Sequence, residues 1–218
     1  MKKLDRAAVS VPPALANPPS DRTFRSLSGQ EKEAIRGALL SMQLARCAYC
    51  DRPTGAKHDD GHVEHFRGQA EHQHLELAWD NLFWSCNDEG TCGKHKDKCS
   101  HTSGPRRRFN SDQILNPSND DPNDYLQFVS DGHVRPREGL SAELQARANE
   151  TLRVFQLDAS PLLTELRRDS VQMLVRAVDF LSDTPPLLRR YVDKEISQAS
   201  SRPFSLAVCQ FLMSVRPQ

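Results

Sequence analysis

The stretch Cys47-Ala48-Tyr49-Cys50 decides the fold that this sequence predicts. Two cysteines separated by two residues can present both thiolates to one tetrahedral Zn²⁺ ion from a tight turn. A second pair of ligands must complete such a site, and Cys86 and Cys92 are the natural candidates. Five residues separate Cys86 from Cys92, whereas a knuckle has two residues between its cysteines. Cys99 or His101 could therefore replace one of this second pair as a ligand. We therefore expect a structural zinc site formed by Cys47, Cys50, Cys86 and Cys92.

Rare residue types are concentrated around this knuckle. Five of the six cysteines fall between positions 47 and 99, and seven of the eight histidines fall between positions 58 and 101. Such a concentration predicts a site, because an ordinary core does not collect cysteine and histidine in one window. A C-x-x-C pair is also found in redox proteins, but the βαβ context that supports this interpretation is missing. The sixth cysteine, Cys209, lies among apolar residues at helical spacing and is expected in the core.

The composition bounds the class of protein. The 218 residues contain 29 Lys plus Arg and 29 Asp plus Glu, which excludes a protein that coats nucleic acid by global positive charge. No apolar stretch approaches the roughly 20 residues that span a bilayer, and Asp5, Pro12 and Pro13 interrupt any signal peptide. We expect a cytoplasmic protein that does not engage a membrane. Cysteines are reduced in that compartment, which favours metal binding over disulfides.

The regions that flank the window are mostly helical. Residues 1–24 are rich in proline, and Ser28-Gly29-Gln30-Glu31 is a capping box that begins a helix to about Arg46. Asp131-Gly132 between alternating segments predicts a hairpin over 125–135. Apolar periodicity predicts further helices over 141–155, 160–181, 186–200 and 203–215. The expected fold class is α+β and mainly helical, with a Pro-rich segment (1–24), a zinc-supported module (25–110) and a hairpin followed by a helical bundle (111–218).

Three further segments follow the knuckle in a characteristic order. They are Gly61-His62-Val63-Glu64-His65-Phe66, Trp79-Asp80-Asn81-Leu82 and Cys92-Gly93-Lys94-His95-Lys96-Asp97-Lys98. Together with the knuckle, this series over 47–98 resembles the HNH, or ββα-metal, nuclease motif. The resemblance implies a small treble-clef-like module that zinc rigidifies and that hydrolyses phosphodiester bonds of nucleic acid.

The resemblance also implies a role for each polar residue of these segments. His65 is expected to act as general base, because the ordinary pKa of histidine lies near ambient pH. Glu64 and His95 are expected to hold a catalytic Mg²⁺ or another divalent cation, which stabilises developing negative charge. Asn81 is expected to fix the orientation of the imidazole through its second nitrogen.

Strand geometry qualifies the assignment of the base. Side chains alternate between faces along a regular strand, so His62 and Glu64 share a face and His65 points away. The assignment to His65 therefore requires the strand to end or bend near Phe66, and otherwise His62 is the better candidate. Gly93 stands where many HNH sequences have Asn, so the second ligand role moves to His95.

Basic residues follow the third cysteine segment closely. Six lie between positions 94 and 108, with Asp97 as the single acidic residue. Beside a phosphate-cutting site in a net-neutral chain, this cluster predicts phosphate binding, for which we name Lys94, Lys96, Lys98 and Arg67. Two groups are expected to have ordinary surface or packing roles: the histidines His58, His72, His74 and His133, and the tryptophans Trp79 and Trp84.

A closer resemblance extends over residues 28–165. The segments 61–66, 79–87, 92–99, 119–128 and 150–158 are similar to the PtuB family, the HNH effectors of Septu and retron-type anti-phage systems. The resemblance implies a toxic effector that cuts DNA or tRNA and is controlled by a PtuA-type ATPase. In retron versions it also implies a reverse transcriptase and its multicopy single-stranded DNA.

A second function class fits the same cysteines. A non-catalytic treble-clef zinc module would bind nucleic acid or a protein partner without chemistry. The joint presence of Glu64, His65 and Asn81 favours the enzyme, because folding around zinc does not require these residues.

Overall fold

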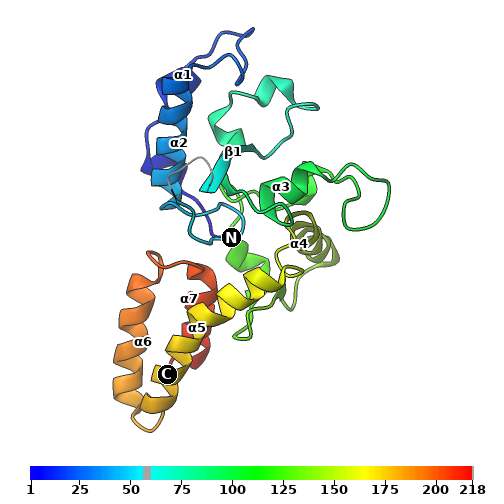
Figure 1. Cartoon of the computed structure of the whole chain (residues 1–218). Helices are drawn as coiled ribbons and strands as arrows, with labels where there is room; N and C mark the ends of the chain where they lie inside the picture. The colour runs from blue at the N-terminus through cyan, green and yellow to red at the C-terminus, as the bar shows by residue number, and fades with distance from the viewer. Residues whose placement is uncertain (56–59, 218) are drawn as a thin grey trace.

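The computed structural model describes residues 1–55 and 60–217, and His58 lies outside them. The fold is mainly helical with two small antiparallel sheets, which confirms the expected α+β class at this level (Figure 1). The helices are α1 (Pro13–Ala16), α2 (Gly29–Gln43), α3 (Cys92–Asp97), α4 (Ala142–Phe155), α5 (Pro161–Leu181), α6 (Pro185–Ala199) and α7 (Ser205–Val215). The strands are β1 (Gly61–His65), β2 (Leu82–Cys86), β3 (Leu126–Phe128) and β4 (Val134–Pro136).

Helix α2 begins at the predicted capping box. The Ser28 hydroxyl accepts a hydrogen bond from the Glu31 amide, and the Glu31 carboxylate accepts one from the Ser28 amide. The helix ends at Gln43, three residues before the expected end. Leu44 and Ala45 both take left-handed φ angles, of 55° and 52°, which turn the chain into the cysteine knuckle.

Strands β1 and β2 pair over their whole length, from Gly61 opposite Cys86 to His65 opposite Leu82. All five residues of β2 are buried. The Gln43 side chain closes the outer edge of β2, because its amide donates to the Trp84 carbonyl and its oxygen accepts from the Trp84 amide. Helix α2 and the sheet are thereby fixed to one another directly before the knuckle.

One hydrophobic cluster joins parts of the chain that are distant in sequence. It contains Leu4, Tyr49, Leu115 and Phe155, and the Tyr49 and Phe155 rings stack with their centroids 4.0 Å apart. The Pro-rich segment and helix α4 therefore share a core with the cysteine-containing module. The predicted division at residues 24 and 110 stays a prediction about domain organisation.

The predicted hairpin forms from β3 and β4, and its turn packs on helix α5. Gly132 has φ 93°, and a Cβ atom there would lie 1.9 Å from the Thr164 carbonyl oxygen, so a residue without a side chain fits this approach. Arg167, buried on α5, donates to the Gly132 and Leu157 carbonyls. These contacts attach the C-terminal helices to the hairpin.

Helices α5, α6 and α7 pack around a second cluster that includes Leu174, Val192 and Leu212. Figure 1 shows these three helices together at the end of the molecule away from β1 and α3. In the described part of the chain, no helix is both long enough and apolar enough to cross a bilayer.

Candidate metal centre and active site

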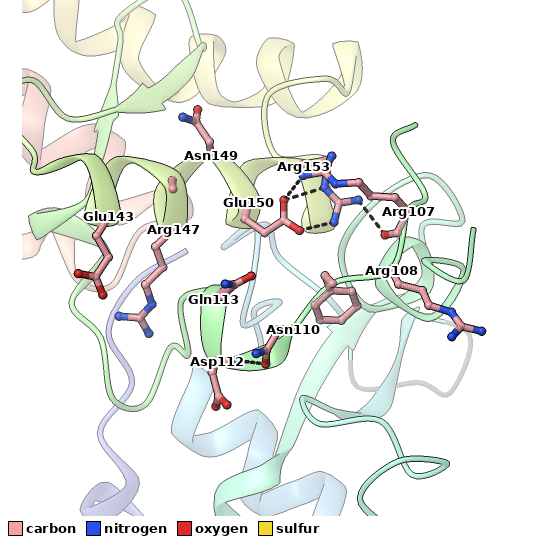
Figure 2. Close-up of a pocket in the computed structure, with 12 residues that line it drawn as sticks. Arg107, Arg108, Asn110, Asp112, Gln113, Glu143, Arg147, Asn149, Glu150 and Arg153 are labelled. Atoms are coloured by element: carbon pink, nitrogen blue, oxygen red, sulfur yellow. Dashed lines mark hydrogen bonds and ion pairs between the residues drawn. The ribbon is translucent and has the colours of Figure 1, made fainter. Parts of the chain in front are cut away.

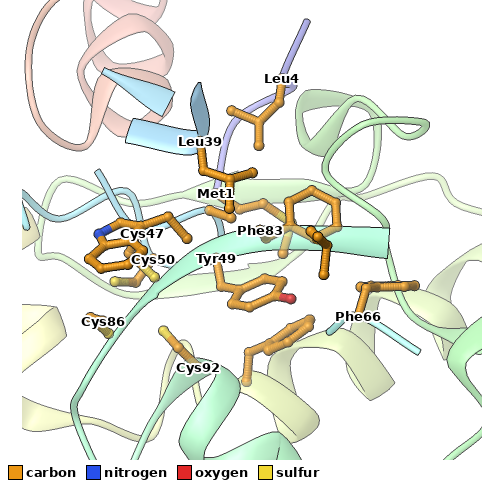
Figure 3. Close-up of a cluster of buried hydrophobic side chains, with 14 of the residues drawn as sticks. Met1, Leu4, Leu39, Cys47, Tyr49, Cys50, Phe66, Phe83, Cys86 and Cys92 are labelled. Atoms are coloured by element: carbon orange, nitrogen blue, oxygen red, sulfur yellow. The ribbon is translucent and has the colours of Figure 1, made fainter. Parts of the chain in front are cut away.

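The four predicted zinc ligands come together in the structure. The Sγ atoms of Cys47, Cys50, Cys86 and Cys92 all lie within 4.8 Å of one another, and all four residues are buried. Figure 3 shows these cysteines to one side of the Tyr49 ring. Four thiolates at such distances match the donor set of a structural tetrahedral zinc site, so the residues fit the expected ion. Within 1–55 and 60–217, no other group of three or more potential ligands converges.

The backbone explains how two unequal cysteine pairs meet. Cys47 and Cys50 lie on a turn closed by a hydrogen bond from the Asp51 amide to the Cys47 carbonyl, with Asp51 at φ 63°. The Ala48 amide donates to the Trp84 carbonyl, which holds this turn against β2. Cys86 ends β2 and Cys92 begins α3, so the five intervening residues form a strand-to-helix loop rather than a knuckle.

The electrostatics of the cluster favour a cation. Burial raises the pKa of Cys50 and Cys92 well above the ordinary value, whereas burial of Cys47 is outweighed by hydrogen bonds from the other three thiols, which lower its pKa. One thiol of the cluster therefore ionises readily, and a bound cation would favour ionisation of the others. A thiol that ionises readily is a good metal ligand, because zinc binds the thiolate.

The alternative ligands are not part of the cysteine cluster: Cys99 lies against His95, and His101 is exposed. Cys209 packs against the hydrophobic cluster of α5–α7 but is only half-buried there, less than expected for a core cysteine.

His62 and Glu64 share one face of β1, as strand alternation requires. His62 Nε2 donates to Glu64 Oε2 at 3.2 Å, and His62 Nδ1 donates to Asn87 Oδ1 at 2.8 Å. Burial would lower the pKa of His62, but the Glu64 carboxylate raises it above the ordinary value. His62 therefore favours the charged imidazolium, which can donate a proton but has no lone pair to accept one.

Lys96 occupies the other side of the Glu64 carboxylate. Its Nζ lies 2.7 Å from Glu64 Oε1 and also donates to the His65 carbonyl at 2.7 Å. Burial would raise the pKa of Glu64, but the ammonium group of Lys96 lowers it, so this pair is ionised. The Lys96 side chain is 2% exposed, so the expectation that it binds phosphate is wrong.

His95 turns away from Glu64. Its Nδ1 donates to the Val154 carbonyl of α4 at 2.9 Å, and burial lowers its pKa. Glu64 is held by Lys96 and His62 instead, so the predicted pair of ligands for a catalytic ion does not converge. A cation already sits on the carboxylate, and these residues do not fit a divalent ion in this arrangement.

His65 points to the opposite side of β1. Its Nε2 donates to the Glu76 carbonyl at 3.0 Å, and its ring meets the Phe24 ring edge to face. A carbonyl can only accept, so Nε2 carries the proton and Nδ1 keeps a lone pair. Burial lowers the pKa of His65, which keeps the ring neutral near pH 7. The strand ends at His65 and the chain bends at Phe66 and Arg67, which meets the condition that the sequence argument set for this base.

Asn81 does not touch the imidazole. Its amide donates to the carbonyls of Arg67 and Leu75, and its oxygen accepts from the Arg67 amide. These bonds use both N–H groups of the Asn81 side chain and stabilise the loop between β1 and β2. The expectation that Asn81 orients His65 directly is wrong, because the Glu76 carbonyl of this same loop does so and Asn81 acts on the loop.

The remaining predicted phosphate ligands lie nearer the surface. The side chains of Lys94 and Lys98 are 37% and 39% exposed, and both approach Glu89. Arg67 donates to Ser111 and forms an ion pair with Asp112. These three cations are accessible, whereas Lys96 is not.

Gly93 and Glu76 are the functional positions that sequence reasoning missed. A Cβ atom at Gly93 would lie 2.6 Å from Glu64 Oε2, so the Gly in place of the usual Asn makes room for the buried carboxylate. The absence of Asn from this position was visible in the sequence and could have indicated this contact. Glu76 contributes a backbone carbonyl, which no side-chain pattern reveals.

The comparisons with known proteins agree with the motifs. No family model matches the chain. The Septu protein PtuB of Bacillus mycoides (strain KBAB4) is 25% identical over an alignment of 203 residues, and the match covers 80% of this chain and 66% of that protein. The chain thus spans less than two thirds of the length of this curated relative. The match confirms the resemblance that residues 61–99 indicate: the chain is similar to a Septu PtuB protein over most of its length.

Proposed function

We propose that this protein is an endonuclease that hydrolyses phosphodiester bonds of DNA or tRNA as a toxic effector in anti-phage defence. The similarity to a Septu protein supports the defence role. The hydrogen bond from His65 Nε2 to the Glu76 carbonyl carries the catalytic part. It leaves a neutral imidazole with one free lone pair in a fixed orientation, which is what a general base needs.

The proposed reaction begins with proton transfer to this lone pair. His65 Nδ1 takes a proton from a water molecule, whose oxygen attacks the phosphorus atom of the scissile ester. The bond from phosphorus to the leaving oxygen breaks, and that oxygen takes a proton from solvent. The exposed cations Lys94, Lys98 and Arg67 are proposed to hold flanking phosphates, since charge-assisted bonds to phosphate oxygens position a strand.

Zinc is proposed to bind the four cysteines and to act on structure alone. It would hold the end of β2, the start of α3 and the knuckle together, and so support the sheet that carries His65 and Glu64. The HNH resemblance also implies Mg²⁺ or another divalent cation. No step is assigned to that ion here, because Glu64 is bound to Lys96 and His95 faces Val154.

The proposed partners follow from the resemblance alone. A PtuA-type ATPase is proposed to control the effector, and a retron reverse transcriptase with its multicopy single-stranded DNA is proposed only where the chain belongs to such a system. Co-purification of the chain with a neighbouring ATPase tests the first of these proposals.

A zinc module without catalytic activity is the second candidate. The observation that favours it is the Glu64–Lys96 pair, which leaves the buried carboxylate neutralised within the protein. This candidate predicts nucleic-acid or protein binding that is indifferent to His65.

Cleavage assays separate the two candidates. Zinc-loaded protein, with and without the ATPase, is incubated with labelled DNA and tRNA, and His65→Ala is compared with His74→Ala, a change at an exposed histidine. If the protein is an endonuclease that uses His65 as its base, only His65→Ala should abolish cutting. Undiminished cutting by His65→Ala, or binding without any cutting by the wild type, would overturn the assignment.

A further inference from the structure

A cavity of about 930 Å³ lies between residues 107–113 and one face of α4, and none of the predicted catalytic residues lines it. Figure 2 shows residues of both segments around it. Its volume falls within the roughly 300–1,000 Å³ typical of small-molecule sites. The function proposed above leaves this cavity without a role.

Most side chains that line the cavity carry a charge or an amide group, and one end is rich in arginine. Glu150 accepts hydrogen bonds from Arg107 at 2.5 Å and from Arg153 at 2.9 and 2.5 Å, so one carboxylate faces two guanidinium groups. Arg108 lines the rim of the cavity; Figure 2 shows its exposed side chain directed away from Glu150, and its Nε donates to the Ser100 carbonyl. Two guanidinium groups on one carboxylate, with Arg108 at the rim, leave an excess of positive charge, which suits a phosphate group.

The middle of the cavity offers different chemistry. Figure 2 shows Gln113 between Arg147 on one side and Glu150 with Arg153 on the other. Asn110 lies beside it, and its oxygen accepts from the Asp112 amide, which leaves its NH₂ group to donate. Phe109, half-buried, lines the same space. Amide side chains match the edges of nucleobases, and an aromatic ring offers a surface on which a base stacks.

The cavity is connected to the proposed active site through Arg67. This residue follows β1 by two positions, donates to Ser111 Oγ at 3.1 Å and pairs with Asp112. Asp112 lines the cavity. Arg67 therefore links the wall of the cavity to the segment that follows His65. A nucleic-acid strand bound at His65 could continue into the cavity.

We propose that this cavity binds one nucleotide of a single-stranded segment of the substrate, with its phosphate at Arg107 and Arg108 and its base at Gln113, Asn110 and Phe109. The inference rests on the proposed action on nucleic acid and assigns the place where the strand is held beyond the cleavage site.

Filling the cavity tests the proposal. Ala146 is exposed on α4 and lines the cavity, whereas its neighbour Gln145 is exposed and does not line it. Ala146→Trp and the matched control Gln145→Trp are introduced into zinc-loaded, full-length protein that carries His65→Ala. Binding of a fluorescent single-stranded oligonucleotide is measured by anisotropy over a range of salt concentrations. Zinc content and thermal melting of the two variants must agree before their affinities are compared.

We expect Ala146→Trp to weaken binding at least tenfold and Gln145→Trp to change it less than twofold. Arg108→Gln should reduce the salt slope by about 0.7, as expected for one lost phosphate contact on a single strand. Adenosine monophosphate should compete for the site, and inorganic phosphate at the same concentration should not. Equal affinities of the two tryptophan variants, or equal competition by inorganic phosphate, would overturn the proposal. If adenosine monophosphate competes but Ala146→Trp leaves oligonucleotide binding unchanged, the cavity does not hold a nucleotide of the substrate strand.

The two proposals fail in different ways. Cleavage by the wild type together with equal binding by both tryptophan variants would remove this inference and leave the endonuclease. Absence of cleavage together with weakened binding by Ala146→Trp would remove the endonuclease proposal and leave the nucleotide site.

Discussion

Lys96 Nζ lies 2.7 Å from Glu64 Oε1, and both side chains are only 2% exposed. The pair joins α3 to β1 on the side of the strand opposite the proposed base His65. Lys96 also approaches Asp97, and His62 binds the second oxygen of Glu64, so each oxygen of the carboxylate faces a basic side chain. The carboxylate expected to hold a catalytic ion is thus engaged by the protein itself.

Breaking this pair on one side should destabilise the fold strongly. We expect Lys96→Met to lower the free energy of unfolding by about 3–5 kcal/mol, because it leaves a buried carboxylate without its cation. The double variant Lys96→Met/Glu64→Gln should recover much of this loss. Urea unfolding of zinc-loaded protein measures both values, and a loss below about 1 kcal/mol for Lys96→Met would show that the pair is not formed.

Gly93 should be intolerant of even a methyl group. A Cβ atom there would lie 2.6 Å from Glu64 Oε2, so Gly93→Ala must displace the carboxylate and should cost about 1–3 kcal/mol of unfolding free energy. Gly37, inside α2, has no atom within 4 Å of the corresponding position. Gly37→Ala is therefore the matched control and should stabilise the protein by about 0.5–1 kcal/mol. Equal effects of the two changes would contradict the packing of Glu64 on α3.

Zinc binding should require the four clustered cysteines and should not require Cys99 or Cys209. We expect one zinc ion per chain by elemental analysis, and Cys92→Ser should lose it, because a tetrahedral site then lacks one ligand. Cys99→Ser and Cys209→Ser should retain the full amount. Strong chelators should unfold the protein as they remove the ion, as followed by circular dichroism. Zinc loss in Cys99→Ser would mean that the ligand set is different.

Asn81 should act on the loop between the strands. Its side chain makes three hydrogen bonds to the backbone of Arg67 and Leu75, so Asn81→Ala should loosen residues 67–76. Amide hydrogen exchange should accelerate in that loop and stay unchanged in α5–α7. The exposed Asn119 provides the control variant Asn119→Ala, which should change neither region. Unaltered exchange of the loop in Asn81→Ala would remove this role.

Local patterns predicted local structure well. The capping box at Ser28, the turn at Asp131-Gly132 and the four clustered cysteines all rest on spacing along the chain, and all are confirmed. The expected end of α2 near Arg46 was wrong because left-handed turns at Leu44 and Ala45 cannot be read from apolar periodicity.

The partners of the site residues could not be predicted in the same way. His95 bonds to Val154, 59 positions away, and Lys96 to Glu64 on another element. Packing against α4 decides which face of α3 meets β1. The sequence alone does not show how α3 is rotated about its axis. The fit of Gly93 against Glu64 follows from the same packing.

The most direct test of the proposed mechanism compares the two histidines of β1 in one cleavage assay under single-turnover conditions. His65→Ala should slow cutting by about 10²-fold or more, as expected for loss of a general base, with zinc content unchanged. His62→Ala should slow it less than tenfold, because the His62 ring nitrogens are both engaged by Glu64 and Asn87. A severe loss in His62→Ala together with full activity in His65→Ala would contradict the assignment of the base.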